Sequence, residues 1–260
     1  AATLAATSEQ PQLEAQVLLA HAMQRPRSWL FAWPETQPSD EQVAHFDNLV
    51  ARRQQGTPIA YLTGEREFWS MKLHVSEATL IPRPDTECLV EAILKQGLPK
   101  HPHILDLGTG TGAIALALAY EHPAATVLAT DLSSSALGIA QRNAEQLGLR
   151  NITFAVGYWF DAVSDDQRFD LIVSNPPYIA EDDPHLAEGD LRFEPRQALS
   201  AGPDGLDELR ALILDAPEYL RPEGWLWLEH GATQGGAVRR LLGARGFEQV
   251  DTGRDLAGLE

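Results

Sequence analysis

The sequence is poor in cysteine and has no long apolar run. Its only cysteine, Cys88, cannot form a disulfide within the chain, a composition typical of proteins from a reducing compartment. A bilayer-spanning helix needs about 20 consecutive apolar residues, and no segment approaches that length. The first residues also lack the charged and apolar regions of a signal peptide. We therefore expect a soluble, cytoplasmic protein without a membrane partner.

Basic residues are scarce as well. Lys and Arg total 20 against 37 Asp and Glu, which gives a net charge of −17. Such an acidic surface repels a phosphate backbone, so we expect no direct nucleic-acid partner. With 260 residues, 44% of them hydrophobic, the chain can still bury a substantial core.

The first quarter of the chain predicts helices and almost no strands, because its apolar residues recur at helical spacing. Ser39 and Gln42 are spaced as a capping box, which predicts a helix from about Asp40 to Gln55. We expect a small all-helical domain over residues 1–64. A run of alternating apolar and aromatic residues then predicts a strand or hairpin that serves as a linker over residues 65–81.

From Pro82 onward, short apolar runs alternate with helical stretches, which predicts an α/β domain with a parallel sheet over residues 82–260. The predicted strands are His103–Leu107, Thr126–Thr130, Ile152–Val156, Phe169–Ser174 and Gly224–Glu229, with a last strand beginning at Phe247. The predicted helices are Gly112–Glu121, Ser134–Leu147, Leu206–Leu220 and Gln234–Leu242.

A glycine-rich loop follows the first of these strands and opens a helix, where backbone amides can approach a ligand closely. Its members are Gly108, Thr109, Gly110, Thr111 and Gly112. The glycine spacing also fits a dinucleotide such as NAD. However, Asp106 precedes the loop, and its charge opposes a pyrophosphate while favouring the ammonium and sulfonium of S-adenosylmethionine. We therefore favour S-adenosylmethionine and keep NAD as a rival.

Two residues near this loop are candidates for holding a nucleoside. Asp131 ends the second predicted strand, where a carboxylate can accept both ribose hydroxyls. It could instead cap the helix that begins near Ser133. Trp159 follows the third strand and offers an apolar plate for an adenine ring, although a simple core tryptophan fits the pattern nearly as well.

The tetrapeptide Asn175-Pro176-Pro177-Tyr178 directly follows the fourth predicted strand. The two prolines fix the backbone and remove two amide donors, which leaves the Pro176 carbonyl and the Asn175 side-chain oxygen as acceptors. A planar NH2 group bonded to both would have its nitrogen aimed at a methyl donor, and Tyr178 could stack on it. The alternative is an ordinary turn with a buried tyrosine.

Other candidate features predict less. His101 and His103 lack an accompanying cysteine or acidic cluster, so we expect no metal site. The acidic segment from Glu181 to Glu194 follows the tetrapeptide, and we interpret it as a lid that shapes access for a basic protein substrate.

With these residues, the sequence resembles the glutamine methyltransferases that modify class 1 peptide-chain release factors. The resemblance covers nearly the whole chain, and its further motifs are Ile81-Pro82-Arg83-Pro84-Asp85-Thr86-Glu87, Arg192-Phe193-Glu194-Pro195, and Gly202 with Asp204-Gly205-Leu206. It implies a Rossmann-like, S-adenosylmethionine-dependent methyltransferase domain that follows the helical domain. We also expect the protein to be a monomer.

The resemblance also implies the roles of individual residues. The donor, which becomes S-adenosylhomocysteine, would be bound by Gly108, Thr109, Gly110, Thr111, Gly112, Asp131, Trp159 and Asn175. The glutamine of a Gly-Gly-Gln loop would be bound by Asn175, Pro176, Pro177 and Tyr178, with Asn175, Pro176 and Tyr178 catalytic.

Two departures from the family keep alternatives open. The family usually has Asp at the position of Tyr158, where a carboxylate can accept from the adenine amine, so a non-catalytic binding module is one alternative. The family also normally carries a last antiparallel strand, and we expect this strand to lie beyond Glu260, the last residue of this sequence. The tetrapeptide by itself is shared with adenine amino-methyltransferases, which is the second alternative.

Overall fold

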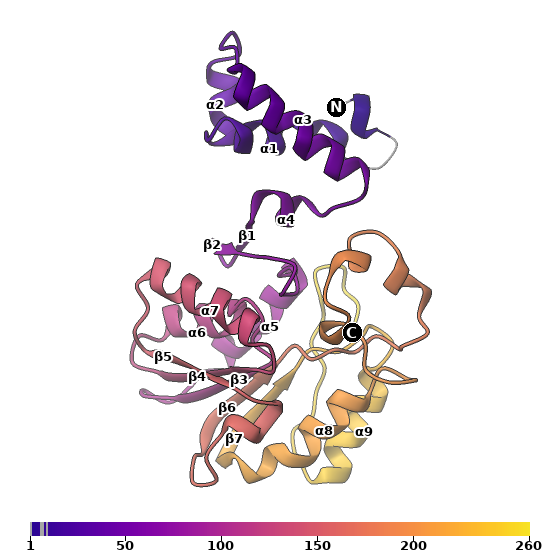
Figure 1. Cartoon of the computed structure of the whole chain (residues 1–260). Helices are drawn as coiled ribbons and strands as arrows, with labels where there is room; N and C mark the ends of the chain where they lie inside the picture. The colour runs from indigo at the N-terminus through magenta and orange to yellow at the C-terminus, as the bar shows by residue number, and fades with distance from the viewer. Residues whose placement is uncertain (1, 6–7, 9) are drawn as a thin grey trace. The chain divides into compact units, whose positions relative to one another are not determined.

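The computed structural model describes residues 2–5, 8 and 10–260, which divide into two units (Figure 1). The smaller unit extends to Glu65 and also contains Ala187–Phe193. The larger unit consists of Arg66–Leu186 and Glu194–Glu260. None of the helices in these residues is long and apolar enough to cross a membrane.

The smaller unit is a bundle of short helices. Its elements are η1 (Ala2–Leu4), α1 (Pro11–Ala22), α2 (Arg27–Ala32), α3 (Asp40–Gln54) and α4 (Ile59–Thr63). The predicted capping box is confirmed, because the Ser39 side chain accepts from Gln42 N while the Gln42 side chain accepts from Ser39 N. Leu4, Leu18 and Leu49 are buried together at the centre of the bundle. The helical character predicted for this segment is therefore correct.

A buried arginine connects two distant parts of the smaller unit. Both oxygens of Glu14 accept from the Arg53 guanidinium at 2.8 Å, and Asp190 accepts from it at 3.1 Å. Arg192 also donates to the Gln55 carbonyl at 3.0 Å. The middle of the acidic segment predicted as a lid thus belongs to the helical unit.

The larger unit is built on a five-stranded parallel sheet in the order β5-β4-β3-β6-β7. The strands are β3 (His103–Leu107), β4 (Thr126–Asp131), β5 (Ile152–Val156), β6 (Phe169–Ser174) and β7 (Leu220–Leu228). The strand order reverses at β3, which is flanked by β4 and β6. In open α/β sheets, ligands bind at the carboxyl ends of the strands at such a switch point.

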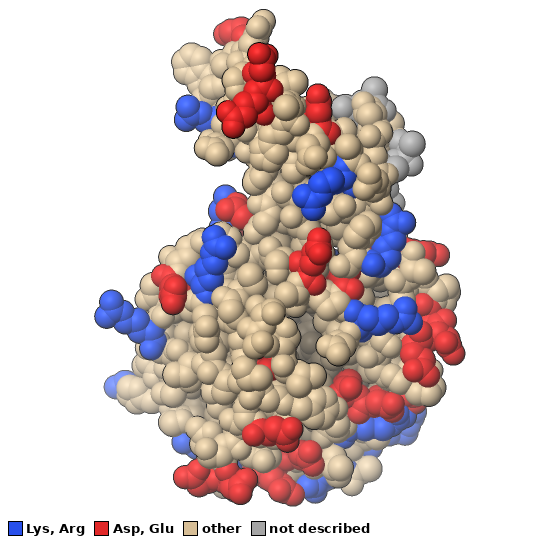
Figure 2. Space-filling view, in the orientation of Figure 1, with Lys and Arg blue, Asp and Glu red and all other residues tan. Residues whose placement is uncertain are grey.

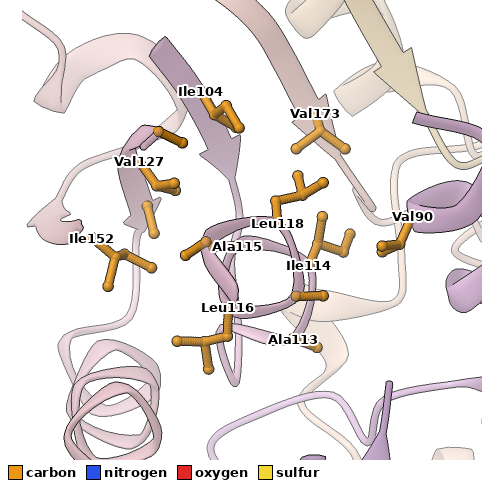
Figure 3. Packing of buried hydrophobic residues seen from close by; sticks show 14 of the residues in the cluster. Val90, Ile104, Ala113, Ile114, Ala115, Leu116, Leu118, Val127, Ile152 and Val173 are labelled. Atoms are coloured by element: carbon orange, nitrogen blue, oxygen red, sulfur yellow. The ribbon is translucent and has the colours of Figure 1, made fainter. Parts of the chain in front are cut away.

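Helices cover both faces of this sheet (Figure 1). They are α5 (Pro84–Gln96), α6 (Ala113–Glu121), α7 (Ser134–Leu147), α8 (Asp207–Asp215) and α9 (Gly235–Arg245). Residues 113–119 of α6 are all buried because this helix is apolar on every side. In Figure 3 the side chains of Ile104, Val127 and Val173 on the strands converge on α6.

The segment predicted as a linker forms the hairpin of β1 (Glu65–Phe68) and β2 (Met71–His74). Both turn residues, Trp69 and Ser70, have positive φ, as in the type I′ turns that suit hairpins. Phe68 and Leu73 pack into the core of the larger unit beside α6.

Several sequence predictions differ from the structure. The strand predicted over Gly224–Glu229 is observed as Leu220–Leu228, and the helix predicted over Gln234–Leu242 as Gly235–Arg245. The helix predicted to end at Leu220 ends at Asp215, because a short 3₁₀ turn containing Pro217 follows and Leu220 begins β7. The strand predicted from Phe247 is wrong: among the described residues none follows β7, and the polar, largely exposed segment after Phe247 offers no face to bury. Helix α5 was not predicted, although Pro84 occupies its first turn.

Candidate active site

A cavity of about 560 Å³ opens at the carboxyl ends of β3, β4 and β6. This volume lies in the range of small-molecule sites. Of the residues predicted from sequence, the cavity is lined by Gly108, Thr109, Gly110, Thr111, Asp131, Trp159, Asn175 and Pro177. Gly112, Pro176 and Tyr178 belong to the same two loops without lining it. The glycine loop and the tetrapeptide, which are about 70 residues apart in the sequence, therefore line the same cavity.

The glycine loop needs its glycines for conformation and for close approach. Gly108, Gly110 and Gly112 all have positive φ, which side chains disfavour. A Cβ on Gly108 would lie 3.0 Å from the Trp159 ring, whereas a Cβ on Gly110 would meet nothing within 4 Å. Gly110 is therefore the position at which the loop backbone faces open space.

Asp106 lies beneath this loop and is 1% exposed. Its Oδ2 accepts from the Thr109 hydroxyl at 2.6 Å and from Ala115 N at 3.2 Å, while its Oδ1 has no partner among the described residues. Burial raises the pKa of the Asp106 carboxyl to about 7, and the charge of Asp131 adds to this rise. A buried carboxylate with one free oxygen beside a cavity is suited to a cationic ligand.

Asp131 ends β4, as predicted. Its Oδ2 accepts from Gly110 N at 2.8 Å and its Oδ1 from Ser133 N at 2.8 Å. The cap of helix α7 is supplied by Ser133, whose hydroxyl accepts from Ala136 N. Asp131 thus links the end of β4 to the glycine loop and lines the cavity without capping the helix itself.

A carboxylate that the sequence did not single out lies beside the aromatic pair after β5. Glu208 Oε2 accepts from the Tyr158 hydroxyl at 2.8 Å and from Trp159 Nε1 at 2.7 Å. Burial raises the pKa of the Tyr158 phenol, and its bond to Glu208 adds to the effect. Glu208 also lines the cavity, so the site has a carboxylate here despite the tyrosine at position 158.

The tetrapeptide follows β6, and its side chains join a hydrogen-bond network. Asn175 Nδ2 donates to Thr86 Oγ1 at 3.2 Å, and Thr86 donates to Glu229 Oε2 at 2.7 Å. The Tyr178 hydroxyl donates to Glu229 Oε1 at 3.2 Å. Thr86 lies on α5 and Glu229 directly follows β7, so neither could be linked to the tetrapeptide from local sequence. The expected stacking of Tyr178 on a flat substrate stays a prediction.

Of the further motifs, one packs against the tetrapeptide and another connects to the segment before α5. Gly202 and Gly205 have positive φ, and a Cβ on Gly205 would lie 2.3 Å from the Tyr178 carbonyl oxygen. Glu194 is buried at 6% exposure, accepts from Ile81 N at 3.0 Å and pairs with Arg83. The end of the predicted lid is thus fixed to the segment that precedes α5.

In residues 2–5, 8 and 10–260 there is no group of three or more His, Cys, Asp or Glu side chains arranged to hold a metal ion.

The surface of the larger unit carries many carboxylates, and Figure 2 shows acidic side chains gathered along its lower margin.

Comparison with known proteins identifies both parts of the chain. Residues 1–64 match the family model described as PrmC N-terminal domain, and residues 98–239 match that of a methyltransferase domain. The release factor glutamine methyltransferase of Pseudomonas aeruginosa is 53% identical over 97% of this chain and 91% of its own length. The protein of the same name from Escherichia coli is 51% identical over 95% of this chain and 89% of its own length.

Solved structures support the fold alone. A methyltransferase from Pyrococcus furiosus matches with a TM-score of 0.56 and 19% identity, covering 81% of this chain and 93% of that one. A ribosomal protein L11 methylase from Lactobacillus delbrueckii matches with a TM-score of 0.50 and 24% identity, covering 67% of this chain and 74% of that one. Together with the two matched domains and the full-length relatives, the parallel sheet and its cavity show that this chain belongs to the release factor glutamine methyltransferase family.

Proposed function

We propose that the protein transfers a methyl group from S-adenosylmethionine to the side-chain amide nitrogen of the glutamine in the Gly-Gly-Gln motif of class 1 release factors. The observation that carries this proposal is the position of Asn175, which lines the same cavity as the glycine loop and has its Nδ2 bonded to Thr86. Its Oδ1 is thereby left to accept from a substrate amide. The names of the full-length relatives support the same substrate.

The residues around the cavity fit this donor. The unpartnered Oδ1 of Asp106 suits its ammonium or sulfonium, and the open space at Gly110 admits a ligand against the backbone. We propose that the donor is held by Asp106 and by the residues predicted from sequence: Gly108, Thr109, Gly110, Thr111, Gly112, Asp131, Trp159 and Asn175. When bound, S-adenosylmethionine supplies an electrophilic methyl group on a sulfonium.

The contribution of the chain to the reaction is to orient and polarise the amide. An amide nitrogen is a poor nucleophile because its lone pair is delocalised, as the rotation barrier of roughly 18 to 20 kcal/mol reflects. We propose that Asn175 Oδ1 and the Pro176 carbonyl accept its two N–H bonds and stabilise the positive charge that develops on nitrogen. An N–C bond forms as the S–C bond breaks, and the nitrogen then releases a proton to water or to one of these acceptors. Holding both reactants in one cavity adds the advantage of proximity.

Pro177 and Tyr178 complete the proposed glutamine site. Pro177 lines the cavity next to Asn175, and the Tyr178 ring is our proposed flat surface beside the amide. Burial raises the pKa of the Tyr178 phenol further above the physiological range, so we assign Tyr178 no role as a proton carrier.

We further propose that residues 1–64 recognise the body of the release factor, residues 65–81 connect the domains and residues 82–260 carry out methyl transfer. A Gly-Gly-Gln loop offers little side-chain surface, while a standard protein interface buries about 800 Å² per partner. The protein would act as a cytoplasmic monomer. The charge of −17 complements a basic protein substrate better than a nucleic acid.

Two rival functions make different predictions. An adenine amino-methyltransferase would use the same tetrapeptide on a nucleic acid, and a binding module would hold the donor without turnover. The test is transfer of an isotope-labelled methyl group from S-adenosylmethionine to a purified class 1 release factor, with an adenine-containing DNA duplex as the parallel substrate. We expect label on the factor only. Label on the DNA would support the first rival, and calorimetric donor binding without any transfer would support the second.

A further inference from the structure

A relay of hydrogen bonds, formed by Asn175, Thr86, Glu229 and Tyr178, runs from the cavity into the interior of the larger unit. Asn175 and Thr86 line the cavity, and Thr86 is only 4% exposed. Glu229 lies behind them, partly buried, with Thr86 on its Oε2 and Tyr178 on its Oε1. Three separate elements contribute its four members: α5 carries Thr86, the loop after β6 carries Asn175 and Tyr178, and Glu229 follows β7.

The chemistry of the groups in this relay determines which group donates each hydrogen bond. An ionised carboxylate only accepts hydrogen bonds, so the single hydroxyl proton of Thr86 must point to Glu229. The Thr86 oxygen is then an acceptor, and the group that Asn175 turns toward it must be its NH2. The Asn175 carbonyl oxygen consequently lies at the opposite edge of the planar amide group, away from Thr86.

We infer that Thr86 and Glu229 are positioning residues, which lock the Asn175 amide in the one orientation that presents an oxygen to the substrate NH2. This inference rests on the proposed function, which needs an acceptor at Asn175. An asparagine flipped by half a turn would present its own NH2 to the glutamine NH2, two donors facing each other. The relay therefore decides whether the site attracts or repels the reacting amide.

The charge state of Glu229 controls the relay. Burial raises the pKa of the Glu229 carboxyl, and hydrogen bonds from Thr86, Tyr178 and Asn175 oppose the rise. Asp85 on α5 adds to the rise, Arg83 lies near Tyr178, and His230 is the neighbouring residue on the chain. When Glu229 is protonated it can donate to Thr86, which frees the Thr86 proton for the Asn175 oxygen and permits the flip. Turnover should therefore fall as the pH drops through the pKa of Glu229.

The first test is the pH dependence of methyl transfer to a release factor by wild type, Glu229→Gln, Thr86→Val and Thr86→Ser. The glutamine variant mimics the protonated carboxyl, and we expect its turnover to fall about tenfold or more, the scale seen when a group that orients a functional side chain is lost. Its acid limb should be absent. Thr86→Val should show a similar loss, while Thr86→Ser should keep most of the activity. Donor affinity should stay within a few-fold in all three variants.

A second measurement is independent of turnover. The side-chain NH2 signals of Asn175, observed by ¹⁵N NMR in the full chain, should shift as Glu229 titrates in the wild type and should not shift in Glu229→Gln. If the wild type transfers no methyl but this titration is seen, the proposed function fails and the relay stands. The relay is overturned if Asn175 shows no titration, or if Glu229→Gln transfers methyl with the wild-type rate and pH profile. A merely structural role would lower the melting temperature without changing the pH profile.

Discussion

The buried carboxyl of Asp106 gives the sharpest prediction about donor binding. Its Oδ2 is occupied by Thr109 and Ala115, and its Oδ1 has no partner in the described part of the chain. Asp106→Asn keeps the shape of the side chain and an oxygen for these two donors, and removes only the charge. The substitution therefore isolates the electrostatic contribution of one carboxylate to binding a cation.

The expected magnitude follows from the pKa of about 7. A carboxyl with that pKa is about one-tenth ionised at about pH 6 and about three-quarters ionised at about pH 7.5, so donor affinity should rise about eightfold over this interval if the ionised form binds. At about pH 7.5 the variant should bind more weakly by about 2 kcal/mol, a factor of about thirty, the scale of a charge-assisted hydrogen bond.

The same carboxyl should lower the stability of the free protein. Its pKa in the folded state lies above the ordinary aspartate value of 3.8, so its contribution to stability is fully present below that value and is lost as the pH rises through about 7. The loss is at most about 4 kcal/mol above that pH. Asp106→Asn should accordingly raise the melting temperature at about pH 8 while leaving it nearly unchanged near pH 4.

Isothermal titration with S-adenosylmethionine at both pH values measures the first effect. The amino group of the donor titrates near pH 8, so the ratio of wild-type to variant affinity at each pH is the quantity to compare. We expect that ratio to increase from about pH 6 to about pH 7.5. Equal affinities of the two proteins at both pH values would refute the assignment of Asp106 to the cationic donor.

Three further predictions concern the tetrapeptide, the aromatic pair and the helical unit. Asn175→Ala should leave donor affinity within a few-fold and reduce turnover about a hundredfold; unchanged turnover in a methyl-transfer assay would remove Asn175 from the mechanism. Tyr158→Asp should weaken donor binding in calorimetry, because the new carboxylate would face Glu208. Tyr158→Phe should bind the donor nearly as the wild type does. Tighter binding by the Asp variant would show that the site lacks a carboxylate. Phe31 and Trp33 are 62% and 56% exposed on the helical unit, and replacing both with Ala should lower activity on the full release factor more than on a short Gly-Gly-Gln peptide. Equal losses on the two substrates would contradict a recognition role for this unit.

Features that depend on neighbouring residues could be predicted from the sequence. The strands β3, β5 and β6 were predicted with the bounds observed, because each is a short run rich in apolar residues. The glycine loop was likewise visible, since its positive φ angles require glycine locally. The motif at Arg83–Glu87 carried part of the family resemblance, but the sequence analysis did not predict that helix α5 begins there.

Features that depend on distant contacts could not be predicted. Thr86 meets Glu229 across 143 residues, and Arg53 meets Asp190 across 137. Glu208 looks like any acidic residue in the first turn of a helix, yet it accepts from both Tyr158 and Trp159. No pattern of spacing encodes such pairings, because they arise from the order of strands in the sheet and from how loops return to it.

The central claim, methylation of a glutamine amide in a release factor, is tested most directly by fragment mass spectrometry. A class 1 release factor is incubated with the full chain and S-adenosylmethionine, digested and sequenced in the spectrometer, with Asn175→Ala as the matched control. We expect one added methyl group on the Gly-Gly-Gln glutamine with the wild-type chain, and about a hundredfold less of this product with the variant. The claim would be contradicted by an unmodified glutamine although the chain binds the donor, or by a methyl group on any other residue.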